Sequence, residues 1–502
     1  MAPLKNKSTP LEIDGETEDE SIKSSFCDEH GVSIGIITCC LVTSVVAVVL
    51  TVSLVFTIGN RDDSKHTSSA EEMKNDDGDE GVTFEDALQA LLENLIFLSL
   101  AKKDLNDTAT NCFVGPEESC ALSSFNLNAP YVVYPNSSDA RCIFSNSTPY
   151  SFQVVRGDPK KLLVYFQGGG ACWNEVSTTS DHGPLCITDA IRSPLKGMLS
   201  RNEKYNPFFY DYTLVEILYC SGDVHSGNVT RLYVDGAGMN VTQSGAANTL
   251  AVMNWLQQQD MAPDELIIAG CSAGSIGAQV WAHWIMTNIN ATHTAVIPDS
   301  FVGYFPPGSQ GPLITSFGVC GGVLLEEEPS LNALCLASNL TVQDVVTNAL
   351  EQHPSTQIAF TNSKTDAVQI GFYKAIGELS NENYDGTISP TSYYVGINEI
   401  FQLYSRQANF VAFLISSSFH CITDNAYFYL ADTSGPVGDI NDAETVNMRT
   451  WTGKLPLGKG SPDSSIAWAC YGKKMSLEEA EESSTAPREY CDSALTNQIP
   501  FA

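Results

Sequence analysis

Positive charge is what this sequence has least of. Its 502 residues include 26 Lys and Arg against 59 Asp and Glu, a net charge of −33. Binding to nucleic acid requires clusters of basic side chains that meet the phosphates. We therefore expect no nucleic-acid partner. The fifteen cysteines also lack the paired spacing of a zinc site, and no internal repeat is visible.

Charge is absent altogether between Val32 and Gly59, where the residues are predominantly apolar. Such a stretch is long enough to cross a bilayer as a helix and longer than the core of a cleaved signal peptide. A buried core helix is the alternative interpretation. We predict a transmembrane signal anchor at 32–59, after a disordered, acidic cytosolic tail at 1–31. An acidic stalk at 60–83 then leads to a folded domain at 84–502.

The chain after the predicted anchor has two features of an oxidising compartment. Twelve of the fifteen cysteines lie there. So do seven Asn-X-Ser/Thr sequons, at Asn106, Asn136, Asn146, Asn228, Asn240, Asn290 and Asn339. Scattered cysteines beside glycosylation sequons indicate disulfides, although their pairing cannot be read from sequence. We therefore expect a single-pass membrane protein whose C-terminal domain is lumenal or extracellular.

Short apolar runs alternate with helix-like segments along the domain. The runs are K-L-L-V-Y-F, Y-T-L-V-E-I-L-Y-C, E-L-I-I-A-G, T-A-V-I-P-D-S, Q-I-A-F-T-N and N-F-V-A-F-L-I-S-S-S. Continuous apolar strands separated by helices are typical of a mostly parallel sheet with helices on both faces, which is an α/β fold. In such sheets the functional groups gather at the C-terminal ends of the strands.

One of these strand ends carries a candidate nucleophile. The sequence G-C-S-A-G, residues 270–274, follows E-L-I-I-A and precedes a helix-like segment, as the G-x-S-x-G nucleophile elbow requires. The elbow is a strained turn that exposes the serine hydroxyl, here that of Ser272. The alternative is a glycine-rich turn that only packs a helix on a strand.

A serine needs a base, and in the α/β-hydrolase order the acid and then the histidine follow it. Four histidines follow Ser272: His283, His293, His353 and His420. We choose His420 because it directly follows the late apolar run F-V-A-F-L-I-S-S-S.

Two aspartates that follow strand-like runs, Asp299 and Asp366, could orient this histidine. The position of Asp366 before the strand of the histidine favours it. Asp299 is left to cap the next segment or to line the pocket.

An oxyanion hole needs backbone N–H groups from the residue after the nucleophile and from an early glycine-rich loop. Ala273 supplies the first. The stretch F-Q-G-G-G-A-C-W-N, residues 166–174, supplies the second through Gly169 and Gly170. A plain glycine linker is the alternative.

With these pieces in order, the chain resembles the pectin acetylesterase / Notum family of serine carboxylesterases over roughly residues 125–430. The resemblance rests on F-Q-G-G-G-A-C-W-N, N-P-F-F-Y, Y-C-S-G-D-V-H-S-G-N, A-G-C-S-A-G-S-I-G, P-D-S-F-V-G-Y-F, T-D-A-V-Q-I and H-C-I-T-D. It implies an α/β-hydrolase-like fold without metal or organic cofactor, and it assigns the same triad and oxyanion residues. Gln167, Ala171 and Ser221 depart from many members, and we interpret these departures as changes in the pocket wall.

The resemblance implies a serine carboxylesterase, and the predicted anchor at 32–59, which lies outside the resemblance, would hold it at a membrane. The expectation is removal of O-acetyl groups from a glycan through an acyl-enzyme. A strongly acidic enzyme should be repelled by polyuronates, which counts against pectin itself. The alternatives are a deacylase that removes a fatty acyl group from a protein, a serine peptidase of this fold, and a non-catalytic surface protein. The expected partner is thus an acylated glycan or an acylated protein.

Overall fold

A mostly parallel sheet runs through the part of the chain that this computed structural model describes. The described residues are 109–144, 147–179, 183–233, 239–380, 388–432, 447–455, 468–470 and 473–475. All of them belong to one compact unit, Asp79–Ala502. The predicted tail, anchor and stalk at 1–83 lie outside the described residues. Within the described ranges no helix has the length and apolar character needed to span a bilayer.

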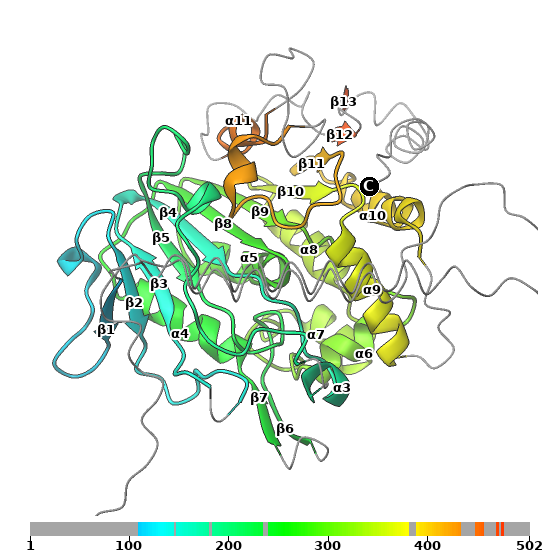
Figure 1. Cartoon of the computed structure of the whole chain (residues 1–502), viewed down its shortest axis with the longest axis horizontal. Coiled ribbons are helices and arrows are strands. Elements are labelled where there is room, and N and C mark those ends of the chain that lie inside the picture. The colour runs from blue at the N-terminus through cyan, green and yellow to red at the C-terminus, as the bar shows by residue number, and fades with distance from the viewer. Residues whose placement is uncertain are drawn as a thin grey trace, which may run out of the picture. The chain divides into compact units, whose positions relative to one another are not determined.

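The strand order of the sheet is β1-β2-β3-β5-β4-β8-β9-β10-β11-β12-β13, which Figure 1 shows from the blue edge at β1 to the orange β11. Only β3 and β13 run antiparallel to their neighbours. The strands are β1 (Thr110–Phe113), β2 (Pro130–Tyr134), β3 (Phe152–Val155), β4 (Asp158–Phe166), β5 (Tyr212–Ile217), β8 (Glu265–Cys271), β9 (His293–Asp299), β10 (Gln357–Ser363), β11 (Phe410–Ile415), β12 (Trp468–Cys470) and β13 (Lys473–Met475). A separate hairpin pairs β6 (Val229–Tyr233) with β7 (Met239–Gln243).

Helices and short 3-10 turns connect the strands. The α-helices are α3 (Glu175–Thr179), α4 (Gly245–Gln257), α5 (Ala273–Asn288), α6 (Gln310–Ser316), α7 (Pro329–Leu336), α8 (Val342–Gln352), α9 (Ala367–Ser380), α10 (Pro390–Tyr404) and α11 (Met448–Thr452). The 3-10 turns are η1 (Leu122–Ser124), η2 (Gly197–Leu199) and η3 (Ala426–Tyr429).

The sheet is buried on both faces, and this explains its continuous apolar strands. Successive side chains of a strand point to opposite faces. On β4, Leu162 and Val164 join the core beneath α4, α5, α8, α9 and α10, whereas Leu163 and Tyr165 join a second core beneath η2, η3 and α11. The expectation of helices on both faces is therefore confirmed, although the second face carries only short ones.

The predicted strands and the helix-like segment predicted after G-C-S-A-G match the observed elements, and the α/β class is confirmed. The sequence did not reveal β3 or the three helices α6, α7 and α8. These helices lie between β9 and β10.

Candidate active site

Three polar side chains follow strands that run in parallel and therefore end at one edge of the sheet. Ser272 comes directly after β8, Asp366 shortly after β10, and His420 shortly after β11. These strands stand in the order β8-β9-β10-β11, all parallel. The fold thus gathers the predicted nucleophile, acid and base at the C-terminal ends of the strands.

The backbone at Ser272 has the strain of a nucleophile elbow. Its φ of 59° and ψ of −123° lie in a region that L-residues rarely adopt, at a cost of about 1–3 kcal/mol. The flanking glycines allow close approach: a Cβ at Gly270 would lie 2.3 Å from the carbonyl oxygen of Gly274, and one at Gly274 would lie 1.9 Å from that of Phe166. The small residues around Ser272 therefore let α5 begin directly against β8 and β4.

Asp366 and His420 form the predicted pair. The Nδ1 of His420 lies 2.9 Å from Oδ2 and 3.0 Å from Oδ1 of Asp366, whose side chain is fully buried. The carboxylate also accepts from the N–H groups of Val368 and Gln369 at the start of α9, and from Nε2 of Gln369. The T-D-A-V-Q segment thus fixes the carboxylate by an N-terminal capping arrangement before it meets the imidazole.

The electrostatics of the pair favour a base that can hold a proton. Burial lowers the pKa of His420, but the charge and hydrogen bond of Asp366 oppose this, and the pKa ends above its usual value. The other ring nitrogen, Nε2, is buried and has no hydrogen-bond partner among the described residues. No hydrogen bond there joins it to the hydroxyl of Ser272, a contact that in ligand-free sites often tightens only when substrate binds.

The remaining histidines lie elsewhere. His283, on α5, places Nδ1 3.0 Å from Nε2 of His353 and Nε2 3.0 Å from a carboxylate oxygen of Glu328. His293 opens β9, at the strand end opposite to Ser272. None of the three accompanies Asp366, which agrees with the choice of His420.

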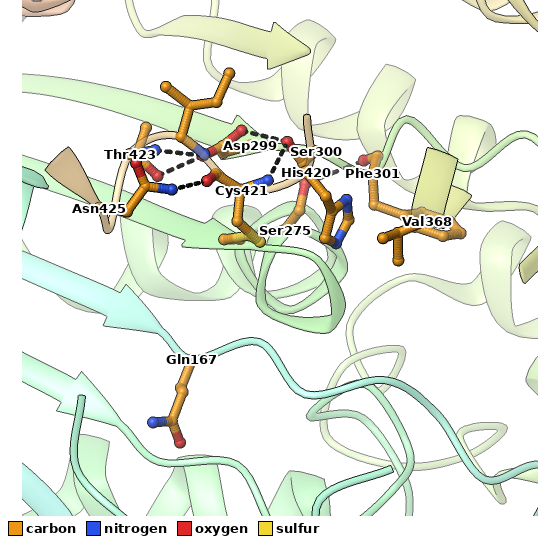
Figure 2. The surroundings of a disulfide bond; sticks show 12 residues. Gln167, Ser275, Asp299, Ser300, Phe301, Val368, His420, Cys421, Thr423 and Asn425 are labelled. Carbon is orange, nitrogen blue, oxygen red and sulfur yellow. Dashed lines mark hydrogen bonds between the residues drawn. A yellow bond between two sulfur atoms is a disulfide. The ribbon is translucent and has the colours of Figure 1, made fainter. Parts of the chain in front are cut away.

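Asp299, the competing acid, binds backbone instead of imidazole. Its Oδ2 accepts from the N–H groups of Ile422 and Thr423 and from the hydroxyl of Thr423, and its Oδ1 accepts from the hydroxyl of Ser300. Its carboxylate therefore holds the segment that follows His420, as Figure 2 shows.

The glycine-rich loop after β4 lies against the nucleophile turn. A Cβ at Gly168 would lie 3.2 Å from Cβ of Ser272. Beside the glycines, the N–H of Ala171 donates to the carbonyl oxygen of Leu185, and the carbonyl oxygen of Gly169 accepts from the N–H of Ile187. These two bonds do not use the N–H groups of Gly169 and Gly170. A φ of 73° at Gly170, where a Cβ would lie 2.1 Å from the Leu185 carbonyl oxygen, requires glycine.

The motif Y-C-S-G-D-V-H-S-G-N, residues 219–228, forms hydrogen bonds with this loop. The carbonyl oxygen of Gln167 lies 2.8 Å from Nε2 of His225. Burial lowers the pKa of His225 to about 4, so its imidazole is neutral and donates this bond. Asp223 in turn accepts from Ser221 and from the N–H of Gly245.

The three departures from the family pattern therefore differ in place. Ala171 lines the cavity beside Ser272. Gln167 bonds to Ile191, Ser193 and Tyr219 instead, and Ser221 bonds to Asp223, so for these two the interpretation as pocket-wall changes is wrong.

An apolar cavity opens beside Ser272, with an empty volume of about 890 Å³ that includes its mouth. Ser272, Ala273, Gly170 and Ala171 stand at the catalytic side. The rest of the lining is almost wholly hydrophobic and comes from the loops after β4 and β5, from α5, α6, α8 and α9, and from the loops between these helices: Trp173, Val224, Ser226, Ile276, Val280, Phe301, Phe305, Leu313, Ile314, Phe317, Val319, Leu324, Leu325, Leu340, Val342, Val345, Phe372 and Ile376.

Sequence reasoning missed a covalent feature of the site. Five disulfides lie in the described chain: Cys112–Cys120, Cys142–Cys220, Cys172–Cys186, Cys271–Cys421 and Cys320–Cys335. The fourth joins the residue before Ser272 to the residue after His420 (Figure 2). The dipeptides C-S and H-C were the available signal. In the described chain the residue groups with metal-ligand spacing contain disulfide-bonded cysteines, so they offer no thiolate.

The family model, two curated relatives and one solved structure that match this chain are pectin acetylesterases or Notum proteins. The family model described as Pectinacetylesterase matches residues 121–377. The palmitoleoyl-protein carboxylesterase Notum of Schmidtea mediterranea is 33% identical over 156 residues, which cover 29% of this chain and 28% of that protein. Pectin acetylesterase 7 of Arabidopsis thaliana is 26% identical over 144 residues, 28% of this chain and 36% of that protein.

The chain thus spans about a third of the length of these two curated relatives. Among solved structures, that of the Wnt deacylase Notum from Drosophila matches with a TM-score of 0.39 and 17% identity, over 59% of this chain and 87% of that one.

Proposed function

Because the chain belongs to the pectinacetylesterase family, we propose that it is a serine carboxylesterase that works through Ser272, His420 and Asp366. The observation that carries the proposal is the meeting of these residues. A strained serine turn, a histidine bonded to a buried carboxylate and a glycine-rich loop share one edge of the sheet, beside a cavity.

The proposed reaction is a two-step acyl transfer. His420 accepts the hydroxyl proton of Ser272 at Nε2 as the oxygen attacks the ester carbonyl, while Asp366 holds Nδ1–H and stabilises the imidazolium. The oxyanion is met by the N–H groups of Ala273, Gly169 and Gly170. His420 then protonates the leaving alcohol and activates the water that releases the acid.

The cavity favours an acyl group longer than acetate. Its lining is apolar well beyond the residues beside the reacting carbonyl. An acetyl group would leave most of this surface without contact, whereas each buried methylene contributes about 0.8 kcal/mol. The Schmidtea relative is named for removing a palmitoleoyl group from protein. The second candidate, removal of O-acetyl groups from a glycan, is favoured by the pectin acetylesterase relative.

A chain-length series separates these two candidates. The full-length protein, purified in detergent, is tested on p-nitrophenyl esters from acetate to palmitate beside Ser272→Ala. We expect kcat/KM to rise with chain length in the wild type, and the variant to lose about 10⁴-fold or more in kcat on every ester. Activity confined to acetate would favour the glycan deacetylase, and equal rates for both folded proteins would refute the esterase.

We also propose that this domain is lumenal or extracellular and is held by the predicted anchor at 32–59. The five sequon asparagines within the described ranges are all exposed: Asn136, Asn228, Asn240, Asn290 and Asn339. Disulfides such as those observed persist in oxidising compartments. Glycosidase treatment of the full-length protein from intact cells should lower its apparent mass, and sealed microsomes should protect the domain from added protease. A domain that is cleaved in sealed microsomes would contradict this orientation.

A further inference from the structure

The nucleophile and the base belong to strands that are not neighbours. Two strands, β9 and β10, separate β8 from β11 in the sheet. At a spacing of about 4.8 Å per strand, the ends of β8 and β11 lie about 14 Å apart. The segment that carries His420 must therefore cross the ends of two strands before it reaches the turn of Ser272.

This crossing segment, residues 416–423, is fixed at each strand that it passes. At the end of β10, the N–H groups of Thr365 and Ala367 donate to the carbonyl oxygens of Ser417 and Ser418, and Asp366 holds His420. At the end of β9, Ser300 accepts from the N–H of Cys421 at 3.0 Å. There Asp299 also accepts from the N–H groups of Ile422 and Thr423. At the end of β8, the disulfide Cys271–Cys421 completes the crossing.

The backbone at these attachment points adopts unusual conformations. Ser272, Ser300 and Cys421 have φ values of 59°, 56° and 59°, in the left-handed region that favours glycine. Residues stay in such conformations only where the surrounding structure determines them. The carbonyl oxygen of Asp299 also accepts from the N–H of Ser272, so β9 contacts both the nucleophile turn and the histidine segment.

We propose that the disulfide Cys271–Cys421, together with Asp299 and Ser300, positions His420 against Ser272 and so sets the rate of acyl transfer. These groups are positioning residues: none of them lies in the lining of the substrate cavity. The inference rests on the proposed esterase function. Its physical basis is that a covalent bond and short hydrogen bonds replace the direct Ser–His contact, which is not formed in this structure.

A double-mutant cycle tests the proposal in the full-length protein. The variants are Cys271→Ala, Cys421→Ala and the double variant, assayed on p-nitrophenyl octanoate. We expect each single variant and the double variant to lose the same factor in kcat, about 10–100-fold, with KM little changed. Misplacing a reacting group by about 1 Å costs about that much, and either substitution alone breaks the bond. Losses that add, or an unchanged kcat, would overturn the proposal.

The matched control is the double variant Cys112→Ala/Cys120→Ala, which removes a disulfide beside the edge strand β1, away from the site. Loss of that bond should lower the melting temperature but leave kcat near the wild-type value. An equal loss of kcat in this control would show that the effect is one of stability, and the proposal would fail.

If the Cys271 and Cys421 variants do not fold, Ser300→Ala decides the question with the disulfide intact. It removes the acceptor of the Cys421 N–H and should lower kcat about tenfold at constant KM, whereas an unchanged kcat refutes the inference. A wild type without ester turnover would instead refute the proposed function, so the two failures are distinguishable.

Discussion

The two sides of the site are held in different ways. Its polar edge, defined here as Ser272, Asp299, Asp366 and His420, is fixed by directed hydrogen bonds and a disulfide at the ends of β8 to β11. Its apolar wall, defined as the hydrophobic cavity lining contributed by α5, α6, α8, α9 and the loops between them, is held by side-chain packing.

The difference follows from what each side has to do. Acyl transfer requires atoms placed within fractions of an ångström, which directed bonds provide. Binding an apolar chain requires only surface removed from water, and the hydrophobic effect is not directional. Changes to the polar edge should therefore alter kcat for every substrate, whereas changes to the apolar wall should alter the choice of substrate.

The largest effect that we expect in the comparison comes from Asp366→Asn. The amide can donate to Nδ1 of His420 and so favour the wrong tautomer, which should lower kcat about 10⁴-fold on short and long esters alike. The charge of Asp366 raises the pKa of His420, and the base acts only when neutral. The acidic limb of the pH–rate profile should therefore move to lower pH in the variant.

The exposed Asp260 provides the control for this substitution, since Asp260→Asn changes the same chemical group away from the site. Its kcat and pH profile should stay those of the wild type. If the loss of kcat in Asp366→Asn depended on the acyl length, the polar edge would also select the substrate, which contradicts the division of roles between the polar edge and the apolar wall.

A substitution in the apolar wall should lower activity less, and only on esters with long acyl chains. Val280 lines the cavity seven residues into α5 from Ala273, about 10 Å along the helix axis. Val280→Phe should fill the part of the cavity far from Ser272 and lower kcat/KM for p-nitrophenyl palmitate about 10–100-fold. The distal methylenes of the palmitoyl chain would then no longer fit in the cavity. Acetate hydrolysis should change less than about twofold.

The same substitution at Val176, which is 55% exposed on α3 and outside the cavity lining, is the matched control. Val176→Phe should leave the whole chain-length profile unchanged. Equal losses on acetate and palmitate for Val280→Phe would mean that the cavity does not bind the acyl chain.

The same contrast explains what the sequence could predict. Ser272, Asp366 and His420 could be predicted because each follows an apolar strand, Ser272 directly and the other two within a few residues, and parallel strands bring such positions to one edge. The apolar wall could not, because its residues come from segments that are scattered along the chain and carry no common motif. The role of Asp299 could not be predicted either, because its carboxylate binds the backbone N–H groups of Ile422 and Thr423, which leave no trace in a sequence.

The smallest expected effect concerns the pH dependence of stability at His225, which bonds to Gln167 of the glycine-rich loop. Burial lowers its folded pKa to about 4 from the ordinary 6.5, so the unfolded chain binds the extra proton first as pH falls. The folded state should therefore lose about 1 kcal/mol between about pH 7.5 and about pH 5.5 at this residue. His225→Gln keeps an N–H donor for the carbonyl oxygen of Gln167 without a titration, so its melting temperature should fall less than that of the wild type over this range.

The control is His293→Gln, at the start of β9, which should keep the wild-type slope of melting temperature against pH. A slope unchanged in His225→Gln would mean that the imidazole takes up its proton as readily in the folded protein as in the unfolded chain, so that burial would not lower its pKa.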